Sequence, residues 1–276
     1  MIMLNRDKET KKLKETDGLK SRAKNQLWRI FKHNDKKKAF RLSRSKFSDY
    51  INCKRCFYLN QVEGLKDIDT IPFTLNNAVD ALCKKEFEYH RKKQTPHPIM
   101  KKEKINAVPY KHPDIEKWQN ALSQGVEYVH PDLNFKLAGG IDDVWENKDT
   151  GELIVVDYKA QSKKEEKKIK NYLDDPYHEG YLLQLDFYRY LFEKNGFEVQ
   201  TTGYFVVYNA TLEREAFENK LDFTADLVPY ETDTSHIEDK VIEMKKLMDG
   251  SKIPEVTPHC QNCNYIIAGG KLINKN

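Results

Sequence analysis

A β-hairpin between residues 137 and 160 is the feature that most constrains the fold of this chain. Two stretches rich in apolar and β-branched residues flank the sequence KDTG, whose composition is typical of a tight turn. A four-residue loop at KDTG sets Asp142 opposite Asp157 on the neighbouring strand. A slip of one residue would bring Asp143 opposite Asp157 instead, so the register decides which carboxylates meet.

Charged side chains gather at the open end of this hairpin. Residues two apart on a strand share a face, so Asp157 and Lys159 should point the same way, while Val156 and Tyr158 point into the core. Carboxylates directly opposite each other destabilise a hairpin, but a divalent cation between them makes the arrangement favourable. Hard oxygen ligands favour Mg²⁺ or Mn²⁺. The simpler alternative is a surface hairpin with an exposed ion pair.

The remaining segments predict an α/β fold with a mixed β-sheet flanked by helices. Helices are expected at residues 43–64 (capped by Ser43 or Ser45), 74–93, 114–129, 178–196 and 235–250, and strands at 201–210 and 220–228. Pro96 and Pro98 should open a loop. On the helix at 74–93, Leu75, Val79, Leu82 and Phe87 recur at helical spacing.

Four of the five cysteines form two Cys-x-x-Cys pairs, Cys53 with Cys56 and Cys260 with Cys263. An odd number of cysteines and the lack of an apolar signal core argue against a disulfide framework. Four thiolates satisfy either a tetrahedral zinc ion or a 4Fe–4S cluster. The separation of the pairs predicts a cysteine-bound metal staple that joins the N- and C-terminal regions. Cys83 is expected to be a small buried hydrophobe, and His259 is a weaker candidate ligand.

Composition sets broad limits on function. The net charge of +4 permits a nucleic-acid partner but does not require one. No apolar run approaches the roughly 20 residues of a membrane helix, so a cytoplasmic setting is expected. We predict three segments: a Lys-rich flexible or helical arm at 1–40, a single domain at 41–268 and a tail at 269–276.

The order of these motifs resembles the PD-(D/E)xK nuclease superfamily, and in particular its RecB-like members, which include CRISPR-associated exonucleases. GGIDDV followed by VVDYKA is similar to the family core, in which an Asp begins one strand and an Asp-x-Lys pair ends the next. Gln184 and Tyr188 match the Gln-x-x-x-Tyr helix of RecB-like members. The resemblance extends from about Leu42 to Tyr265 and includes the cysteines.

The resemblance implies a restriction-endonuclease-like core and assigns roles to named residues. Lys159 would orient the attacking water, and Gln184 and Tyr188 would bind the substrate backbone or brace the catalytic strand. Family members often carry His where this chain has Asp80, which keeps an oxygen ligand. The implied ligands of one or two Mg²⁺ or Mn²⁺ ions are the side chains of Asp80, Asp142 and Asp157 and the carbonyl oxygen of Tyr158.

The cysteines depart from the family pattern. Some RecB-like members bind an iron–sulfur cluster through one early and three late cysteines, whereas this chain has two of each. The resemblance implies a 4Fe–4S cluster, with Zn²⁺ as the alternative, held by Cys53, Cys56, Cys260 and Cys263.

The function implied is a metal-dependent deoxyribonuclease of exonuclease type that acts in DNA processing, repair or defence. Single- or double-stranded DNA is the expected partner, other proteins of such a complex are candidates, and no membrane is expected. Two alternatives stay open. One is a nucleic-acid-binding or scaffold subunit that does not cut, and the other is RNA cleavage on the same fold.

Overall fold

The computed structural model describes residues 4–7, 9–15, 29–32, 38–68, 71, 73–164 and 169–275. Much of the predicted arm, namely residues 1–3, 8, 16–28 and 33–37, lies outside the described residues. The chain separates into two compact units. The first unit consists of residues 1–72, 129–136 and 238–276, and the second of 73–128 and 137–237. The predicted boundaries at 40 and 268 stay predictions.

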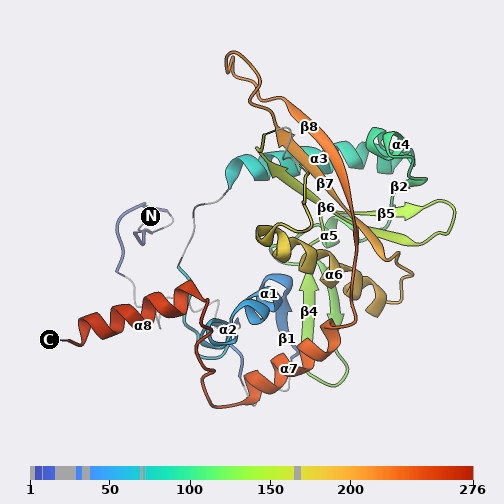
Figure 1. The fold of residues 1–276 in the computed structure, drawn as a ribbon. Coiled ribbons are helices and arrows are strands. Elements are labelled where there is room, and N and C mark those ends of the chain that lie inside the picture. The colour runs from blue at the N-terminus through green and yellow to red at the C-terminus, as the bar shows by residue number, and fades with distance from the viewer. Residues whose placement is uncertain are drawn as a thin grey trace. The chain divides into compact units, whose positions relative to one another are not determined.

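The second unit is built on a five-stranded sheet in the order β2-β5-β6-β7-β8 (Figure 1). Its strands are β2 (Ala107–Pro109), β5 (Asp143–Asn147), β6 (Leu153–Gln161), β7 (Thr202–Ala210) and β8 (Phe223–Glu231). β6 and β7 run parallel and the other neighbours run antiparallel. The sheet is therefore mixed, and the helices beside it complete the predicted α/β fold.

The register of the hairpin is the one predicted from its turn. β5 and β6 pair antiparallel with Asp143 opposite Val156, and the backbone of Asn147 donates to the carbonyl oxygen of Glu152 across the turn. Continuing this register outward sets Asp142 against Asp157. The alternative register, with Asp143 opposite Asp157, is excluded.

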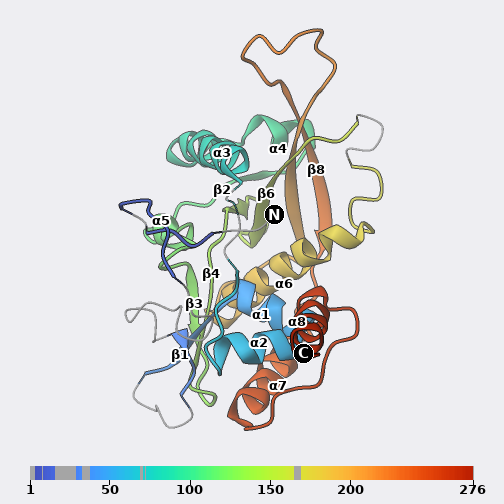
Figure 2. The ribbon, with the colours of Figure 1, turned by 90° about the vertical axis from the view of Figure 1, so that its left-hand side faces the viewer.

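Two helices pack against opposite sides of the central strand β6 (Figure 2). They are α3 (Thr74–Lys93), which has the predicted bounds, and α6 (Glu179–Lys194), which is followed by Gly196 in a left-handed conformation. On the α6 side, Leu185 and Val155 both lie within 3.4 Å of the position that a Cβ atom on Gly203 would occupy. Both faces of β6 are therefore buried.

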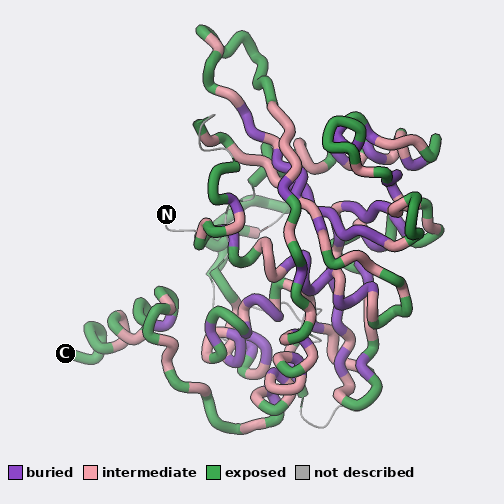
Figure 3. The backbone as a smooth tube through the Cα atoms, turned by 45° about the vertical axis from the view of Figure 1, so that its right-hand side comes forward, coloured by how far each residue is buried: buried purple, intermediate pink, exposed green. Residues whose placement is uncertain are grey.

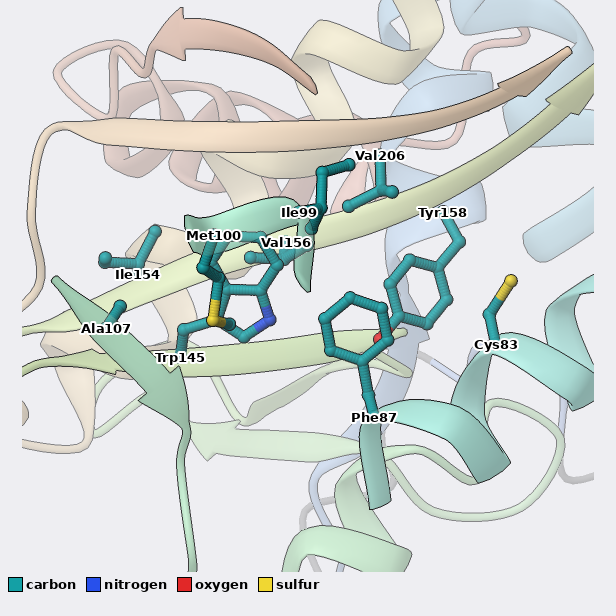
Figure 4. Packing of buried hydrophobic residues seen from close by; sticks show 10 residues of the cluster. All are labelled: Cys83, Phe87, Ile99, Met100, Ala107, Trp145, Ile154, Val156, Tyr158 and Val206. Atoms are coloured by element: carbon teal, nitrogen blue, oxygen red, sulfur yellow. The ribbon is translucent and has the colours of Figure 1, made fainter. Parts of the chain in front are cut away.

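The core on the α3 side joins the helix to the sheet through Cys83 and Phe87 (Figure 4). Buried residues, drawn purple in Figure 3, run along the strands of this sheet. Ile154, Val156 and Tyr158 point into this core, as the strand alternation predicted. Of the apolar residues at helical spacing on α3, Phe87 is buried, while Leu75 and Leu82 are exposed.

Two predictions of secondary structure were wrong, the helix at 114–129 and the loop after Pro96. Residues 114–129 form only the short helix α5 (Ile115–Trp118) and then strand β3 (Val126–Val129). Gly125 between them is left-handed, and a Cβ atom there would lie 2.5 Å from the carbonyl oxygen of Gly139, so the helix cannot continue. The loop expected after Pro96 contains α4 (Pro98–Lys102), whose N-terminus is capped by the His97 side chain.

The first unit contains α1 (Arg44–Asn52), α2 (Lys54–Gln61), most of α7 (Ile237–Asp249) and α8 (Gln261–Ile273). A single helix was expected at 43–64, but Cys53 adopts extended backbone angles and divides it in two. Ser43 caps α1, as predicted. A second, three-stranded sheet has the order β1-β4-β3, with β1 at Phe40–Ser43 and β4 at Phe135–Gly139.

A buried ion pair holds α3 to the hairpin of the second unit. The guanidinium of Arg91 pairs with the carboxylate of Asp143, and both side chains are almost fully buried. Asp143 also accepts hydrogen bonds from the hydroxyl of Tyr158 at 2.7 Å and the backbone N–H of Val144 at 2.8 Å. Burial raises the pKa of Asp143, while the charge of Arg91 opposes that rise. These contacts give Asp143 a structural role.

Replacing Arg91 with methionine should lower the free energy of unfolding by about 3–5 kcal/mol, because the Asp143 carboxylate would stay buried without its counter-charge. Urea unfolding followed by circular dichroism measures this loss. Lys92→Met is the matched control, since the Lys92 side chain is 75% exposed, and we expect a change within about 0.5 kcal/mol. Equal stability of the Arg91→Met protein and the wild type would contradict the structural role of the pair.

Within the described part of the chain, none of the helices is long and apolar enough to cross a membrane.

Candidate functional site

Three carboxylates of the second unit come together beside the outer end of the hairpin. Asp142 precedes β5, Asp157 lies on β6 and Asp80 lies on α3. One oxygen of Asp142, Oδ2, accepts a hydrogen bond from the backbone N–H of Tyr158 at 2.9 Å, which ties the two strands together at this point. The structure thus places Asp142 next to each of the other two side chains that were predicted to hold a metal ion.

The carboxylates are close enough to repel one another. Burial raises the pKa of Asp157 to about 7, and although Lys159 opposes this rise, the neighbouring Asp142 adds to it. Burial also raises the pKa of Asp80, again with a contribution from the charge of Asp142. Asp142 therefore acts electrostatically on both of the other acids.

Lys159 lies against Asp157 as the spacing on the strand predicted. Its ammonium group forms an ion pair with Asp157 Oδ2 and approaches Gln184 Oε1 at 3.3 Å. It also lies 4.2 Å from the centre of the Tyr181 ring, in a cation–π arrangement. Tyr181 was not among the site residues predicted from the sequence. Its position three residues before Gln184, on the same helix face, is the signal that could have found it.

Gln184 and Tyr188 brace the strand that carries these charges. The Gln184 amide donates to Asp157 Oδ1 at 2.7 Å and lies 2.8 Å from the Tyr188 hydroxyl, which donates to the carbonyl oxygen of Gly140. A Cβ atom on Gly139 would lie 2.7 Å from the Tyr188 ring, so the ring needs a glycine there. The Gln-x-x-x-Tyr pair thus reaches both strands of the hairpin.

A second lysine, Lys84, lies within the acidic cluster and was missed by the sequence prediction. It follows Asp80 by one helical turn, and its Nζ lies 2.9 Å from Asp80 Oδ2 and 3.3 Å from Asp142 Oδ1. Burial would lower the pKa of Lys84, but the charges of Asp142 and Asp80 outweigh burial and raise it. The ammonium group therefore stays charged.

The donor set fits a hard divalent cation. Asp80 Oδ1 is buried, and no donor among the described residues reaches it. A buried carboxylate oxygen without a donor is costly, and a cation would compensate it. The candidate side-chain ligands are all carboxylate oxygens, and Asp142 repels each of the other two acids. Such a set of ligands favours Mg²⁺ or Mn²⁺ over a soft metal.

The four paired cysteines form a separate cluster in the first unit. Their sulfur atoms all lie within 4.8 Å of one another, which allows the group to hold a metal ion. Three of the sulfur–sulfur distances are 3.6 Å (Cys53 to Cys263), 3.5 Å (Cys56 to Cys260) and 3.4 Å (Cys56 to Cys263). The two cysteine pairs, one early and one late in the chain, therefore come together as the predicted metal staple requires. Cys83 is buried in the second unit, as expected, and is not a member of this group.

Each Cys-x-x-Cys pair lies at the start of a helix. Cys53 Sγ accepts from the backbone N–H of Cys56 at the start of α2, and Cys260 Sγ accepts from that of Cys263 at the start of α8, both at 3.5 Å. Burial raises the pKa of Cys53, but hydrogen bonds from Thr257 and from the Cys56 backbone outweigh burial and lower it to about 6. This favours the thiolate of Cys53, the form that binds metals, whereas burial raises the pKa of Cys56 and Cys263.

The sequence of this chain matches one known protein family. Residues 72–268 match the family model described as PD-(D/E)XK nuclease superfamily. The chain belongs to this superfamily, and membership implies a hydrolytic nuclease with a nucleic-acid substrate and a divalent metal ion. The crystal structure of an alkaline exonuclease from Laribacter hongkongensis is similar at 10% sequence identity and a TM-score of 0.36, over 84% of this chain and 94% of that one. No curated protein matches the sequence.

Proposed function

We propose that this chain is a Mg²⁺- or Mn²⁺-dependent deoxyribonuclease of RecB-like exonuclease type that serves DNA processing, repair or defence. The observation that carries the proposal is the position of Asp142, whose carboxylate acts on both Asp80 and Asp157, together with the ammonium of Lys159 paired to Asp157. This is the arrangement that phosphodiester hydrolysis needs: oxygen ligands for a cation, and a positive charge next to them.

The side chains divide the work of hydrolysis between them. Asp80, Asp142 and Asp157, with the carbonyl oxygen of Tyr158, would hold the cation, which supplies a more acidic water and a polarised phosphate when bound. Lys159 orients the attacking water and offsets charge on the phosphate as it develops. Gln184 fixes Lys159 and Asp157 relative to each other through its amide oxygen and nitrogen.

The proposed substrate is DNA, and we expect basic residues after the C-terminal end of β6 to bind its phosphates. Lys163 and Lys164 follow the strand, and Lys170 lies beyond residues 165–168, which are outside the described part of the chain. Lys163 is partly engaged by Asp175 at 3.1 Å. Lysines at such positions contact phosphates without reading bases, so binding should weaken steeply as salt increases.

Incubation of the purified chain with end-labelled single- and double-stranded DNA tests the proposal. We expect digestion with Mn²⁺ or Mg²⁺ and none with EDTA, and release of mononucleotides or short fragments from an end would indicate exonuclease action. Binding without digestion under every metal condition would instead support a non-cutting subunit. Preferential digestion of RNA of the same sequence would assign the fold to an RNA substrate.

Replacing Gln184 with alanine should reduce the cleavage rate about 10–100-fold, the usual effect of removing a residue that orients a metal-binding carboxylate. The loss arises because Asp157 and Lys159 both lose a hydrogen-bond partner. The measurement is the single-turnover rate at saturating Mn²⁺. Gln200→Ala is the control, because Gln200 is bonded to Glu152 at the far end of the hairpin. An unchanged rate in Gln184→Ala would refute the bracing role.

For the cysteine cluster we propose a single tetrahedral Zn²⁺ ion in preference to the 4Fe–4S cluster implied by the family resemblance. A zinc ion with Zn–S bonds of about 2.3 Å holds its sulfurs about 3.8 Å apart, and the spacing of 3.4–3.6 Å for three pairs supports this geometry. A 4Fe–4S cluster places eight atoms between its ligands and therefore needs sulfurs that lie farther apart.

A further inference from the structure

Lys84 occupies the position between two of the carboxylates that the proposed function assigns to the metal ion. Its Nζ lies 2.9 Å from Asp80 Oδ2 and 3.3 Å from Asp142 Oδ1, and its side chain is only 24% exposed. The spacing of four residues places Asp80 and Lys84 on the same face of α3. The contact with Asp142 depends on the packing of α3 against β6.

The carboxylates of Asp142 and Asp157 both have charged or hydrogen-bonding partners within the chain. Asp142 Oδ2 accepts from the backbone of Tyr158, and Asp142 Oδ1 faces Lys84. Asp157 accepts from Gln184 on one oxygen and pairs with Lys159 on the other. A divalent ion that binds Asp80 and Asp142 together must therefore displace the ammonium of Lys84 or tolerate a positive charge beside it.

We propose that Lys84 is an internal counter-ion that competes with the divalent cation for Asp80 and Asp142, and so weakens and tunes metal binding. The inference rests on the proposed function, since it takes these carboxylates as metal ligands. In the metal-free protein, Lys84 offsets the repulsion between the two acids. On metal binding the ammonium leaves the carboxylates, because a divalent charge interacts with them more strongly than a single one.

The contact with both acids distinguishes this role from an ordinary helix ion pair. A lysine that only stabilised α3 through Asp80 would leave the metal affinity unchanged when removed. A lysine that held the acids in place for the metal would weaken binding when removed. Competition alone predicts that removal of the ammonium strengthens binding, so the sign of the change decides between the three roles.

The test is isothermal titration of the full-length chain with Mn²⁺ at pH 8, using wild type and Lys84→Met. We expect the Kd for Mn²⁺ at this site to fall by about tenfold or more in Lys84→Met. Lys85→Met is the matched control, because Lys85 is the next residue, is exposed and carries the same charge, so its Kd should stay within about twofold of wild type. Lys84→Arg keeps the charge and should also bind Mn²⁺ as weakly as wild type.

An unchanged or weaker Mn²⁺ affinity in Lys84→Met, or the absence of Mn²⁺ binding at this site in every variant, would overturn the proposal. Lys84→Gln provides a second uncharged variant with the same expected gain if Lys84→Met fails to fold by circular dichroism. If Lys84→Met binds Mn²⁺ more tightly but no variant digests DNA, the competition is supported and the nuclease proposal is refuted. Failure of the competition proposal can therefore be told apart from failure of the nuclease proposal.

Discussion

Lys159→Ala should abolish DNA cleavage while leaving DNA binding intact. Removing one preorganised charge that acts on the transition state typically costs about 3 kcal/mol, or on the order of a hundredfold or more in rate. Phosphate contacts elsewhere on the chain, which supply most of the binding free energy in such proteins, are untouched. Single-turnover cleavage with Mn²⁺ and fluorescence anisotropy with labelled DNA measure the two effects separately.

Lys148→Ala is the matched control for this experiment. Lys148 lies at the turn of the same hairpin, is exposed and carries the same charge, so its loss should leave the cleavage rate within a few-fold of wild type. Because Asp157 is fully buried and loses its ion-pair partner in Lys159→Ala, thermal unfolding of that variant with and without Mn²⁺ is needed to establish that it folds. A folded Lys159→Ala protein that cleaves at the wild-type rate would remove Lys159 from the mechanism.

The central part of the candidate site was predictable because its geometry is local. The four-residue turn fixes the hairpin register, and the two-residue period of a strand then fixes which side of β6 carries Asp157 and Lys159. The spacing of Gln184 and Tyr188 on a helix is equally local. Short-range rules therefore suffice to predict that Asp142, Asp157 and Lys159 meet, whereas the contact of Gln184 with Asp157 depends on the packing of α6 against β6 and was expected only from the family resemblance.

Other features depend on packing between distant segments and gave no such signal. Arg91 and Asp143 are 52 residues apart in the chain and meet only because α3 lies on the sheet. Lys84 approaches Asp142 for the same reason. The exposure of Leu75 and Leu82 also reflects which face of α3 meets the sheet, since helical spacing alone does not state which side is covered.

Backbone conformation accounts for the wrong element boundaries. Gly125 is left-handed and closely approached by Gly139, so the segment 114–129 turns into a strand where its apolar spacing suggested a helix. At Cys53 the chain leaves the helical conformation, and the sulfur atom then caps α2. The Cys-x-x-Cys motif itself indicates this helix start. Its first thiol accepts a hydrogen bond from the backbone N–H three residues later, as an N-cap residue does.

Replacing Cys263 with serine should release the bound metal ion and destabilise the first unit. The Cys263 sulfur is buried and lies within 3.6 Å of two other cysteine sulfurs, so its loss removes a ligand that the remaining three cannot replace. Structural zinc contributes apparent free energies of about 10–16 kcal/mol in small zinc-binding peptides, and we expect this substitution to cost more than about 5 kcal/mol. Hydrogen exchange should rise in α2 and α8, the helices that begin at the cluster.

Cys83→Ser is the matched control for the cluster, because Cys83 is equally buried but lies in the second unit. It should leave the metal content of the purified protein unchanged, whereas Cys263→Ser should lose it. Elemental analysis identifies the metal: one zinc per wild-type chain and a colourless solution are expected. Four irons per chain, with brown colour and absorption near about 400 nm, would instead assign a 4Fe–4S cluster. Full metal content in Cys263→Ser would show that these four sulfurs do not form the binding site.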